Sequence, residues 1–339
     1  MATVTILGAG DMGFAISTPV SANGHDVRLW GTPIDAEIIE TLRAGGVHPR
    51  MGTAVRPGVR LFSPDEAAAA VEGADIVLFA VTSVGIRPIV EQFAAKLLHV
   101  PVIMTIAKGF DPGPDGDAIL LLPEVIAERT SSPIVGVGGP SKANEVARGI
   151  PTGIVFGGPG EAAEFCADAF RTPAYNVEVT DDIVGVEVAA AMKNAYAIAL
   201  GVSDGLEKAT GVPHHNFRAA LFPRAVQEMG KLAEALGGRA ETVAGRPGAG
   251  DLQVTISSGR NRLLGERIGA GEPGPQAAAA LREAGITVEG YDALGFGHRL
   301  ARSLEDPATG HPLRLPLLEA LYAVLHEGAP AAEALWSAV

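Results

Sequence analysis

The sequence contains one cysteine, few aromatic residues and fewer basic than acidic side chains. Because Cys166 is alone in 339 residues, no intramolecular disulfide can form, and no cluster of metal ligands is present. Aromatic residues make up 5% of the chain and the formal net charge is −13. This charge argues against a general affinity for nucleic acid or anionic membranes, although it leaves room for a local basic pocket. The composition fits the reducing cytoplasm best.

The chain also lacks a recognisable signal peptide and an uncharged run long enough to span a membrane. Its first residues already have the pattern of a strand, with no basic segment before an apolar stretch. The most apolar segment, 183–202, carries Glu187, Lys193 and Asn194 near its middle, where they are costly in lipid. We therefore expect a long buried helix and no membrane insertion. With 47% hydrophobic residues, the chain is long enough for two domains.

The N-terminal segment 4–16 carries the most informative motif. A short apolar run ends in Gly8-x-Gly10-x-x-Gly13, and an apolar helical pattern follows at once. Gly8 allows a sharp turn, Gly10 lets a pyrophosphate approach the backbone, and Gly13 lets the helix pack closely on the strand. The helix N-terminus then offers free N–H groups to phosphates. This context favours dinucleotide binding over a purely structural turn.

Strands and helices alternate along the first half of the chain. Strands are expected at 4–7, 26–30, 76–80, 102–106, 134–137, 153–156 and 176–179, and helices at 12–22, 35–44, 63–71, 84–97 and 161–169. Continuous apolar strands with helical crossovers predict an α/β fold with a Rossmann-like, doubly wound parallel sheet. The stretches 45–57 and 111–117 have the composition of surface loops.

From residue 181 onward the pattern is helical. Helices are expected at 182–206, 216–236, 260–269, 274–284, 289–303, 316–327 and 331–337. We therefore predict a dinucleotide-binding domain over residues 1–180 and an all-helical, substrate-binding C-terminal domain over residues 181–339.

The end of the second expected strand bears on the choice of cofactor. It reads Leu29-Trp30-Gly31-Thr32-Pro33, without the carboxylate that commonly holds the ribose hydroxyls of NAD. Nothing there repels a 2′-phosphate, and Thr32 can donate a hydrogen bond to one. Arg43 and Arg50 either reach that phosphate or are solvated surface residues. We predict NADP or NAD as the cofactor, with NADP slightly favoured.

Two lysines are candidates for proton transfer, which hydride transfer to a carbonyl requires. Lys193 lies mid-helix among apolar residues, where burial lowers the pKa of a lysine, and the adjacent Asn194 can orient an oxygen. The alternative for Lys193 is a side chain that extends to the surface along its stem. Lys108 follows a buried strand, where doubly wound folds place ligands.

Two glycine-containing segments complete the pattern. Gly138-Gly139-Pro140-Ser141 follows an expected strand and offers free N–H groups. The second segment reads Gly250-Asp251-Leu252-Gln253-Val254-Thr255 and continues to Gly259-Arg260-Asn261-Arg262. An arginine at a helix start suits a phosphate, because a guanidinium and helix N–H groups converge there. Each segment alone has a structural alternative.

Together these residues resemble the NAD(P)-dependent glycerol-3-phosphate dehydrogenase family over nearly the whole chain. The resemblance is carried by the glycine motif with Asp11 and Met12, and by Ala107-Lys108-Gly109, Gly139-Pro140-Ser141-Lys142-Ala143-Asn144-Glu145-Val146, Met192-Lys193-Asn194, Gly201-Val202-Ser203-Asp204-Gly205, Gly250-Asp251-Leu252, Gly259-Arg260-Asn261-Arg262 and Val288-Glu289-Gly290. It implies a cytoplasmic homodimer that reversibly reduces dihydroxyacetone phosphate to sn-glycerol 3-phosphate, within glycerophospholipid metabolism. It implies no metal.

The resemblance also implies roles for individual residues. Lys193 matches the proton donor and acceptor, with Lys108 and Asp251 as further catalytic residues. The implied substrate contacts are Lys108, Gly139, Ser141, Lys193, Asn194, Asp251, Thr255, Arg260 and Asn261. The implied cofactor contacts are Gly8, Gly10, Asp11, Met12, Gly13, Thr32, Ser83, Lys108, Ala143, Arg260 and Glu289.

The chain departs from the family pattern at several positions. Lys142 replaces an aromatic residue, Gly259 stands where bacterial members often have serine, and the stretch 207–215 lacks the usual glycine and aspartate pattern. Further departures are Thr82 and Pro223, which replace a proline and a threonine. These changes leave open a reductase of a longer polyol or ketose phosphate, or of a 3-hydroxy acid. A non-catalytic NADP-binding sensor is the alternative from another class.

Overall fold

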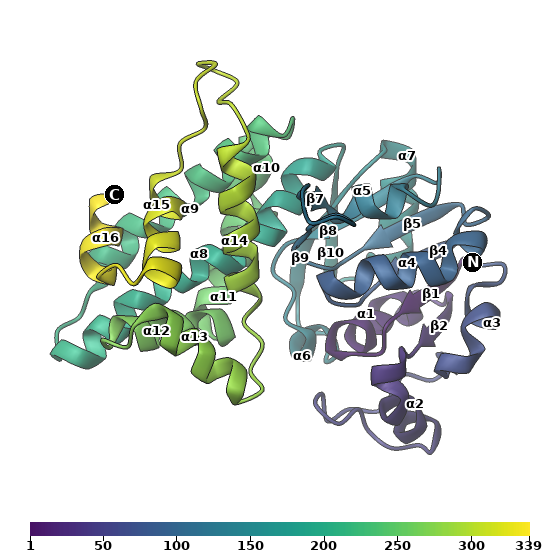
Figure 1. Cartoon of the computed structure of the whole chain (residues 1–339). Coiled ribbons are helices and arrows are strands. Elements are labelled where there is room, and N and C mark those ends of the chain that lie inside the picture. The colour runs from purple at the N-terminus through teal and green to yellow at the C-terminus, as the bar shows by residue number, and fades with distance from the viewer. The chain divides into compact units, whose positions relative to one another are not determined.

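The computed structural model describes all residues, 1–339, and divides into two compact units. Unit 1 comprises Met1–Gly113 and Leu120–Ile183, and unit 2 comprises Pro114–Ile119 and Val184–Val339. In Figure 1, unit 1 contains the sheet with its flanking helices, and unit 2 is built from helices. The expected fold class is therefore confirmed.

An eight-stranded sheet runs through unit 1 in the order β10-β9-β8-β5-β4-β1-β2-β3. The strands are β1 (Thr3–Leu7), β2 (Asp26–Trp30), β3 (Arg60–Phe62), β4 (Ile76–Phe79), β5 (Val102–Thr105), β8 (Ile134–Gly138), β9 (Thr152–Gly157) and β10 (Tyr175–Thr180). All neighbours pair in parallel except β8 and β9. The strand order reverses between β1 and β4, and ligands bind beyond the carboxyl ends of strands at such a point.

Two features of the sheet are absent from the sequence-based prediction. β3 has three residues, none of them fully buried, so its pattern is too short to stand out from a loop. The antiparallel direction of β9 follows from the connection through residues 139–151, which contains one short helix, α6 (Ala143–Val146), in place of a full crossover helix.

The helices of unit 1 cover both faces of the sheet. They are α1 (Asp11–Ala22), α2 (Ala36–Arg43), α3 (Ala67–Val71), α4 (Ser83–Leu97), α5 (Leu122–Ala127), α6 and α7 (Gly160–Phe170). Along β4, Ile76 and Leu78 pack into one core cluster, whereas Val77 and Phe79 pack into the other. Because both faces are buried, the central strands β4 and β5 are almost entirely apolar, as the sequence predicts.

Unit 2 is arranged around the long helix α8 (Ile183–Thr210). The other helices are α9 (His215–Ala235), α10 (Ala240–Ala244), η3 (Arg246–Gly250), α11 (Asp251–Ser257), α12 (Arg260–Gly269), α13 (Gly274–Glu283), α14 (Glu289–Arg302), α15 (Pro316–Tyr322), η4 (Ala323–Glu327) and α16 (Ala331–Ser337). The sequence does not predict α10, η3 and α11, which are five to seven residues long.

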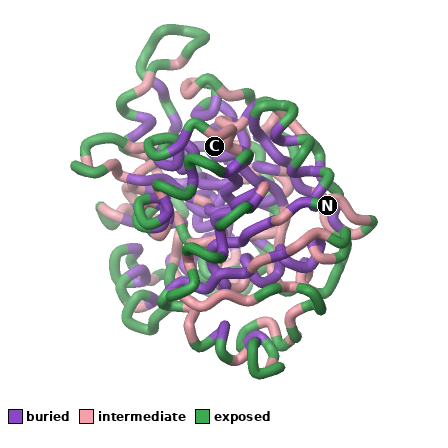
Figure 2. Tube along the Cα trace, turned by 90° about the vertical axis from the view of Figure 1, so that its right-hand side faces the viewer, coloured by how far each residue is buried: buried purple, intermediate pink, exposed green.

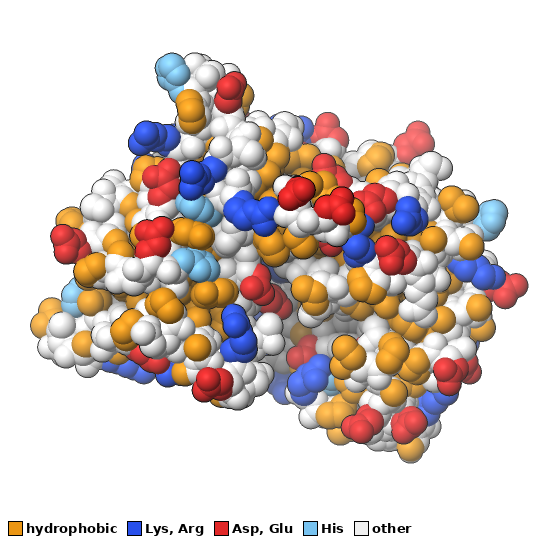
Figure 3. Space-filling model, in the orientation of Figure 1, with side chains coloured by type: hydrophobic (Ala, Val, Ile, Leu, Met, Phe, Trp, Pro, Cys, Tyr) orange, Lys and Arg blue, Asp and Glu red, His pale blue; other side chains and the backbone are white.

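By length and composition, α8 is the one helix that is apolar enough to cross a membrane. In the structure, 89% of its most apolar window is buried, which is the pattern of a core helix in a soluble protein. The exposed trace in Figure 2 follows loops such as the segment between α14 and α15, where residues 307–312 are all exposed. On the face in Figure 3, acidic and basic side chains are interspersed.

Candidate functional site

The glycine turn between β1 and α1 is shaped by packing at two of its three glycines. At Gly8, where φ is +114°, a Cβ atom would lie 2.8 Å from the Ala80 carbonyl oxygen. A Cβ at Gly13 would lie 1.9 Å from the Gly8 oxygen. At Gly10, in contrast, the nearest atom would be 3.9 Å away. No side chain caps α1, so the turn combines free N–H groups with open space at Gly10, as a pyrophosphate requires.

An acidic residue that sequence reasoning missed lies beside this turn. Asp35 Oδ2 accepts hydrogen bonds from the Ala9 N–H (3.1 Å), the Thr32 N–H (3.1 Å) and the Thr32 hydroxyl (2.8 Å). The short helix η1 (Pro33–Asp35) reverses the chain after β2 and brings the Asp35 carboxylate next to the glycine turn. The sequence does not indicate this position, because Asp35 lies five residues after Trp30, beyond the end of the strand. Thr32 therefore donates to Asp35, and would face a ligand as an acceptor rather than as the expected donor.

The two arginines considered as phosphate ligands have different positions. Arg50 forms an ion pair with Asp11 through Nε, and its NH2 lies 3.9 Å from the position a Cβ would take at Gly10. Its side chain is 59% exposed, so the guanidinium is accessible beside the turn. Arg43 instead pairs with Glu66, and the hydrogen bond from the Ser63 N–H, together with those from Arg43 and the Ser63 hydroxyl, lowers the pKa of Glu66 to about 2. Only Arg50 lies at the glycine turn.

His48 holds the Arg50 loop against the turn. Its ring is fully buried, 4.7 Å from the ring of Phe14 between centroids, and Nε2 lies 3.2 Å from the Ala9 carbonyl oxygen. Nδ1 accepts the N–H groups of Arg50 and Met51, both at 3.3 Å. Because a carbonyl can only accept, the neutral ring with hydrogen on Nε2 satisfies all three contacts. Burial accordingly lowers the pKa of His48.

The remaining predicted residues of unit 1 follow the carboxyl ends of β4, β5 and β8. Lys108 follows β5, and Ser83 begins α4. The two segments are close, because a Cβ atom at Gly109 would lie 2.8 Å from the Cβ atom of Ser83. Ser141 follows β8, and its hydroxyl lies 3.7 Å from the sulfur of Met12 in α1. Since β1, β4, β5 and β8 are parallel, these segments share one edge of the sheet with the glycine turn.

In unit 2, the ammonium group of Lys193 is held by two side chains of α11. Nζ lies 3.0 Å from Asp251 Oδ1 and 2.7 Å from the Thr255 hydroxyl oxygen. Thr255 donates its own hydrogen to the Asp251 carbonyl (2.7 Å), so it accepts from Lys193. Lys193 is 7% exposed and Asp251 1% exposed. The lysine therefore does not extend to the surface along its stem, and its direction is fixed.

A second set of hydrogen bonds surrounds the neighbouring Asn194. Asn261 donates to the Asn194 side-chain oxygen (2.9 Å) and accepts from the Gly290 N–H (2.9 Å). Asn194 in turn donates to Glu289 Oε2 (3.3 Å), and Glu289 Oε1 pairs with Arg260 NH2 (3.5 Å). The starts of α12 and α14 therefore converge on the middle of α8. The half-exposed Arg260 guanidinium beside these amides can hold a phosphate.

The structure thus gathers the predicted site residues into one set in each unit. In unit 1 these are Gly8, Gly10, Asp11, Met12, Gly13, Thr32, Ser83, Lys108, Gly139, Ser141 and Ala143. In unit 2 they are Lys193, Asn194, Asp251, Thr255, Arg260, Asn261 and Glu289. No group of three or more His, Cys, Asp or Glu side chains is arranged to hold a metal.

Of the departures from the family pattern, Lys142 and Gly259 adjoin these sets, whereas the stretch 207–215 lies elsewhere in unit 2. Gly259 immediately precedes α12 with φ +149°, a conformation that suits glycine. Lys142 is the residue immediately before α6. Residues 207–215 form the end of α8 and the link to α9.

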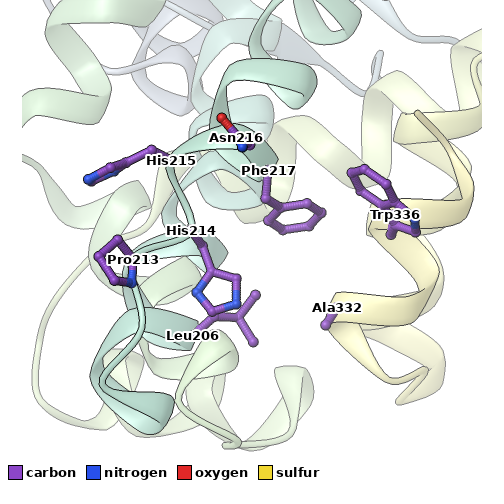
Figure 4. Close-up of a pocket in the computed structure, with 8 residues that line it drawn as sticks. All are labelled: Leu206, Pro213, His214, His215, Asn216, Phe217, Ala332 and Trp336. Atoms are coloured by element: carbon purple, nitrogen blue, oxygen red, sulfur yellow. The ribbon is translucent and has the colours of Figure 1, made fainter.

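A cavity of about 550 Å³ lies elsewhere in unit 2, between α8, α9 and α16. Figure 4 shows its lining: Leu206, Pro213, His214, His215, Asn216, Phe217, Ala332 and Trp336. Phe217 and Trp336 form its aromatic wall, with ring centroids 5.9 Å apart. None of the predicted site residues lines this cavity, so we place the chemistry at Lys193 instead.

Comparison with known proteins agrees with the resemblance. The family model described as the NAD-dependent glycerol-3-phosphate dehydrogenase N-terminus matches residues 3–163, and the model of the C-terminus matches residues 182–336. The chain belongs to this family. Among glycerol-3-phosphate dehydrogenases, an NADP(+)-dependent enzyme of Archaeoglobus fulgidus is 37% identical, with 98% of each chain covered. An NAD(P)+ enzyme of Symbiobacterium thermophilum is also 37% identical, covering 96% of this chain and 90% of its own.

Solved structures give the same result. The crystal structure of a glycerol-3-phosphate dehydrogenase from Coxiella burnetii has a TM-score of 0.83 and 28% identity. The alignment covers 99% of this chain and 98% of that one. Both units therefore have counterparts in a single glycerol-3-phosphate dehydrogenase chain.

Proposed function

We propose that this protein reversibly reduces dihydroxyacetone phosphate to sn-glycerol 3-phosphate with NADP or NAD. Membership of the glycerol-3-phosphate dehydrogenase family supports the reaction type. The observation that supports its chemistry is the buried Lys193, whose ammonium group is fixed by Asp251 and Thr255. A proton donor held in one direction is what carbonyl reduction requires of the protein.

In this mechanism Lys193 donates a proton to the carbonyl oxygen of the substrate and takes it back in the reverse direction. Asp251 and Thr255 orient Nζ, and the negative charge of Asp251 stabilises the protonated lysine. Arg260 and Asn261 bind the substrate phosphate, and Asn194 orients the substrate from the next position on α8. We propose Lys108, Gly139 and Ser141 as further substrate contacts, as the family resemblance implies.

The dinucleotide is bound at the glycine turn, where the open space at Gly10 and the uncapped start of α1 fit a pyrophosphate. When bound, it supplies or accepts the hydride. We propose that Thr32 and Arg50 lie on its adenosine side, and that Met12, Ser83 and Ala143 contact it along the sheet edge. We propose Glu289, which accepts a hydrogen bond from Asn194, and Arg260 as further cofactor contacts, as the family resemblance implies.

The function is tested by following oxidation of NADPH and NADH at saturating dihydroxyacetone phosphate. We expect steady turnover, which a non-catalytic sensor would not give. The same assay with longer ketose phosphates, a 3-keto acid and unphosphorylated dihydroxyacetone defines the substrate. A higher kcat/KM for a longer ketose phosphate or for a keto acid would replace the proposed substrate without changing the reaction type.

We also propose that the enzyme is a cytoplasmic homodimer and that residues 1–180 and 181–339 act as its cofactor and substrate domains. The low cysteine content supports the compartment. Light scattering coupled to gel filtration tests whether the enzyme is a dimer. Expression of residues 1–180 alone, followed by titration with NADPH, tests whether this part of the chain binds the cofactor.

Replacement of Arg50 by methionine is expected to weaken NADPH more than NADH. Losing one charge-assisted contact to the 2′-phosphate should raise the KM for NADPH about tenfold and leave that for NADH within about twofold. The control is Arg43→Met, since Arg43 pairs with Glu66 away from the turn. Equal increases for both cofactors would show that Arg50 acts on the turn itself and not on the 2′-phosphate.

Cofactor binding is expected to weaken at acidic pH, where the folded protein takes up a proton on His48, at a pKa below 6.5, the ordinary value of histidine. The pKa of His48 is lowered by burial and by Arg50, although Ala9, Asp11 and Asp35 oppose this. As the pH falls, His48 is protonated in the unfolded chain before it is protonated in the folded protein. The free energy of unfolding therefore decreases from about pH 6.5 down to the pKa of His48 in the folded protein. Protonated Nδ1 would face two N–H donors and release the Arg50 loop.

The measurement is the NADPH dissociation constant between pH 7.5 and 5.5 for wild type and His48→Gln. We expect a steeper loss of affinity in the wild type than in the variant. Identical slopes would exclude His48 as the titrating group.

A further inference from the structure

Helices α8 and α12 pack with their backbones in contact. On α8, a Cβ at Gly201 would lie 2.4 Å from the Arg262 carbonyl oxygen. On α12, a Cβ at Gly265 would lie 2.0 Å from the Ile198 oxygen. Gly205 and Gly269 extend the same contact by one turn on each helix. Glycines at this spacing let two helices approach closely, so a small displacement of α12 also displaces the residues of α8 that it contacts.

One carboxylate, that of Asp204 on α8, pairs with arginines from two other helices. Arg262 of α12 donates from Nε to Asp204 Oδ2 (2.6 Å), and Arg218 of α9 forms an ion pair with Asp204 Oδ1. Arg218 also donates to the Ser203 hydroxyl (2.9 Å). The Asp204 side chain is 12% exposed. Without this carboxylate, two guanidinium groups would face each other in a largely buried position.

Arg262 lies at the start of α12, directly after Arg260 and Asn261. No side chain caps this helix, and Gly259 precedes it with φ +149°, a conformation that suits glycine. The first turn of α12 is therefore positioned by side chains that point toward α8. Asn261 provides one such contact through Asn194, and Arg262 provides the other through Asp204.

We infer that Asp204 is a positioning residue for recognition of the substrate phosphate. It acts through Arg262, which fixes the helix turn that presents Arg260 and Asn261. This inference rests on the proposed function, because it assumes that these two residues bind the phosphate. It places a determinant of phosphate recognition on α8 ten residues beyond Asn194, outside the site itself. The contribution of Asp204 should therefore depend on whether the substrate carries a phosphate.

A second ion pair joins the same two helices and offers a matched control. Lys208 of α8 pairs with Glu266 of α12, one turn further from the site, and the lysine side chain is 65% exposed. Lys208→Met removes this pair while leaving Asp204, Arg262 and Arg218 in place. Glu266 is 14% exposed and also lies 3.5 Å from Arg262 NH2, so its carboxylate keeps a cationic neighbour in this variant. An ion pair with an exposed lysine contributes little to stability.

The experiment compares wild type, Asp204→Asn and Lys208→Met with two substrates, dihydroxyacetone phosphate and dihydroxyacetone. For Asp204→Asn we expect kcat/KM to fall about tenfold or more with the phosphorylated substrate and to stay within about twofold with dihydroxyacetone. The dissociation constant of NADPH should not change. Lys208→Met should match wild type with both substrates.

An equal loss with both substrates would overturn the inference, because it would indicate general damage to unit 2. An unchanged kcat/KM for dihydroxyacetone phosphate would overturn it as well. If Asp204→Asn does not fold, Arg262→Met tests the same contact from α12 and is expected to show the same dependence on the phosphate. Wild-type turnover is measured first: its absence overturns the proposed function and this inference together, whereas normal turnover with an unaffected Asp204→Asn overturns the inference alone.

Discussion

Replacement of Lys193 by methionine is expected to abolish reduction of dihydroxyacetone phosphate while leaving NADPH binding intact. Proton transfer by a positioned side chain contributes about 10²- to 10⁴-fold to a rate, and this site offers no second group at the same place. Asp251 and Thr255 both bond Nζ, so neither is directed at a substrate oxygen in its stead. The expected result is therefore a kcat at least about 10³-fold below wild type.

The substitution also has a structural cost that must be separated from the catalytic one. It removes the ion pair that Lys193 forms with the Asp251 carboxylate, of which 2% is exposed. Breaking a buried pair in this way destabilises a protein by about 3–5 kcal/mol. The double variant Lys193→Met/Asp251→Asn removes the buried carboxylate charge as well and should recover much of the lost Tm without recovering turnover.

Three measurements decide the role of Lys193: kcat, the NADPH dissociation constant and Tm, each for the single and the double variant. Catalytic and structural contributions are distinguished if Tm recovers in the double variant and kcat does not. More than a few per cent of wild-type kcat in either variant would remove Lys193 from proton transfer.

The sequence predicts those parts of the fold that repeat a simple pattern. The central strands β4 and β5 are almost entirely apolar because both faces of the sheet are covered, and α8 is recognisable because its segment 183–202 is predominantly apolar. β3 and the helices α10 and α11 are too short to establish a period. The antiparallel pairing of β8 with β9 depends on a connection whose direction no local pattern records.

The site follows the same division. Lys193 and Asn194 are identifiable because they interrupt an apolar helix, and Arg260 because it begins a helix; the roles of Asp251 and Asn261 come from the family resemblance. Their grouping in unit 2 depends on how α8, α11, α12 and α14 pack, which spacing along the chain does not reveal.

The sequence does not predict that Asp35 and His48 contact the glycine turn, because each reaches it from a loop that folds back on the sheet edge. Asp35 reaches the glycine turn because one short helical turn reverses the chain after β2. His48 reaches it from a loop that the sequence describes only as rich in glycine and proline. A signal in retrospect is the Thr32-x-x-Asp35 spacing, which is typical of a capping box.

Gly290 shows most directly how packing determines the site, and its replacement by alanine is expected to inactivate the enzyme. Gly290 lies in the first turn of α14, where its N–H donates to Asn261. A Cβ atom there would lie 2.3 Å from the Asn194 carbonyl oxygen and 2.9 Å from the Asn261 side-chain oxygen. The first of these atoms belongs to the backbone of α8, so α14 must move away.

This movement would separate Glu289 and Asn261 from Asn194 and disturb the neighbouring Lys193. Misplacement of catalytic groups by about 1 Å costs about 100-fold in rate, and we expect a loss of kcat/KM of at least that size. The same substitution five residues further along α14 provides the control. At Gly295 a Cβ would meet nothing within 4 Å. Gly295→Ala should keep wild-type kinetics and gain up to about 1 kcal/mol in stability from the higher helix propensity of alanine.

Steady-state kinetics with dihydroxyacetone phosphate, together with thermal unfolding, compare the two alanine variants directly. Since both change one hydrogen atom to a methyl group on the same helix, a difference between them arises from the neighbours of Gly290 and not from the helix itself. Wild-type kinetics for Gly290→Ala would mean that α14 can shift without moving Asn194 and Asn261, and the hydrogen bonds between these residues would then not be required for catalysis.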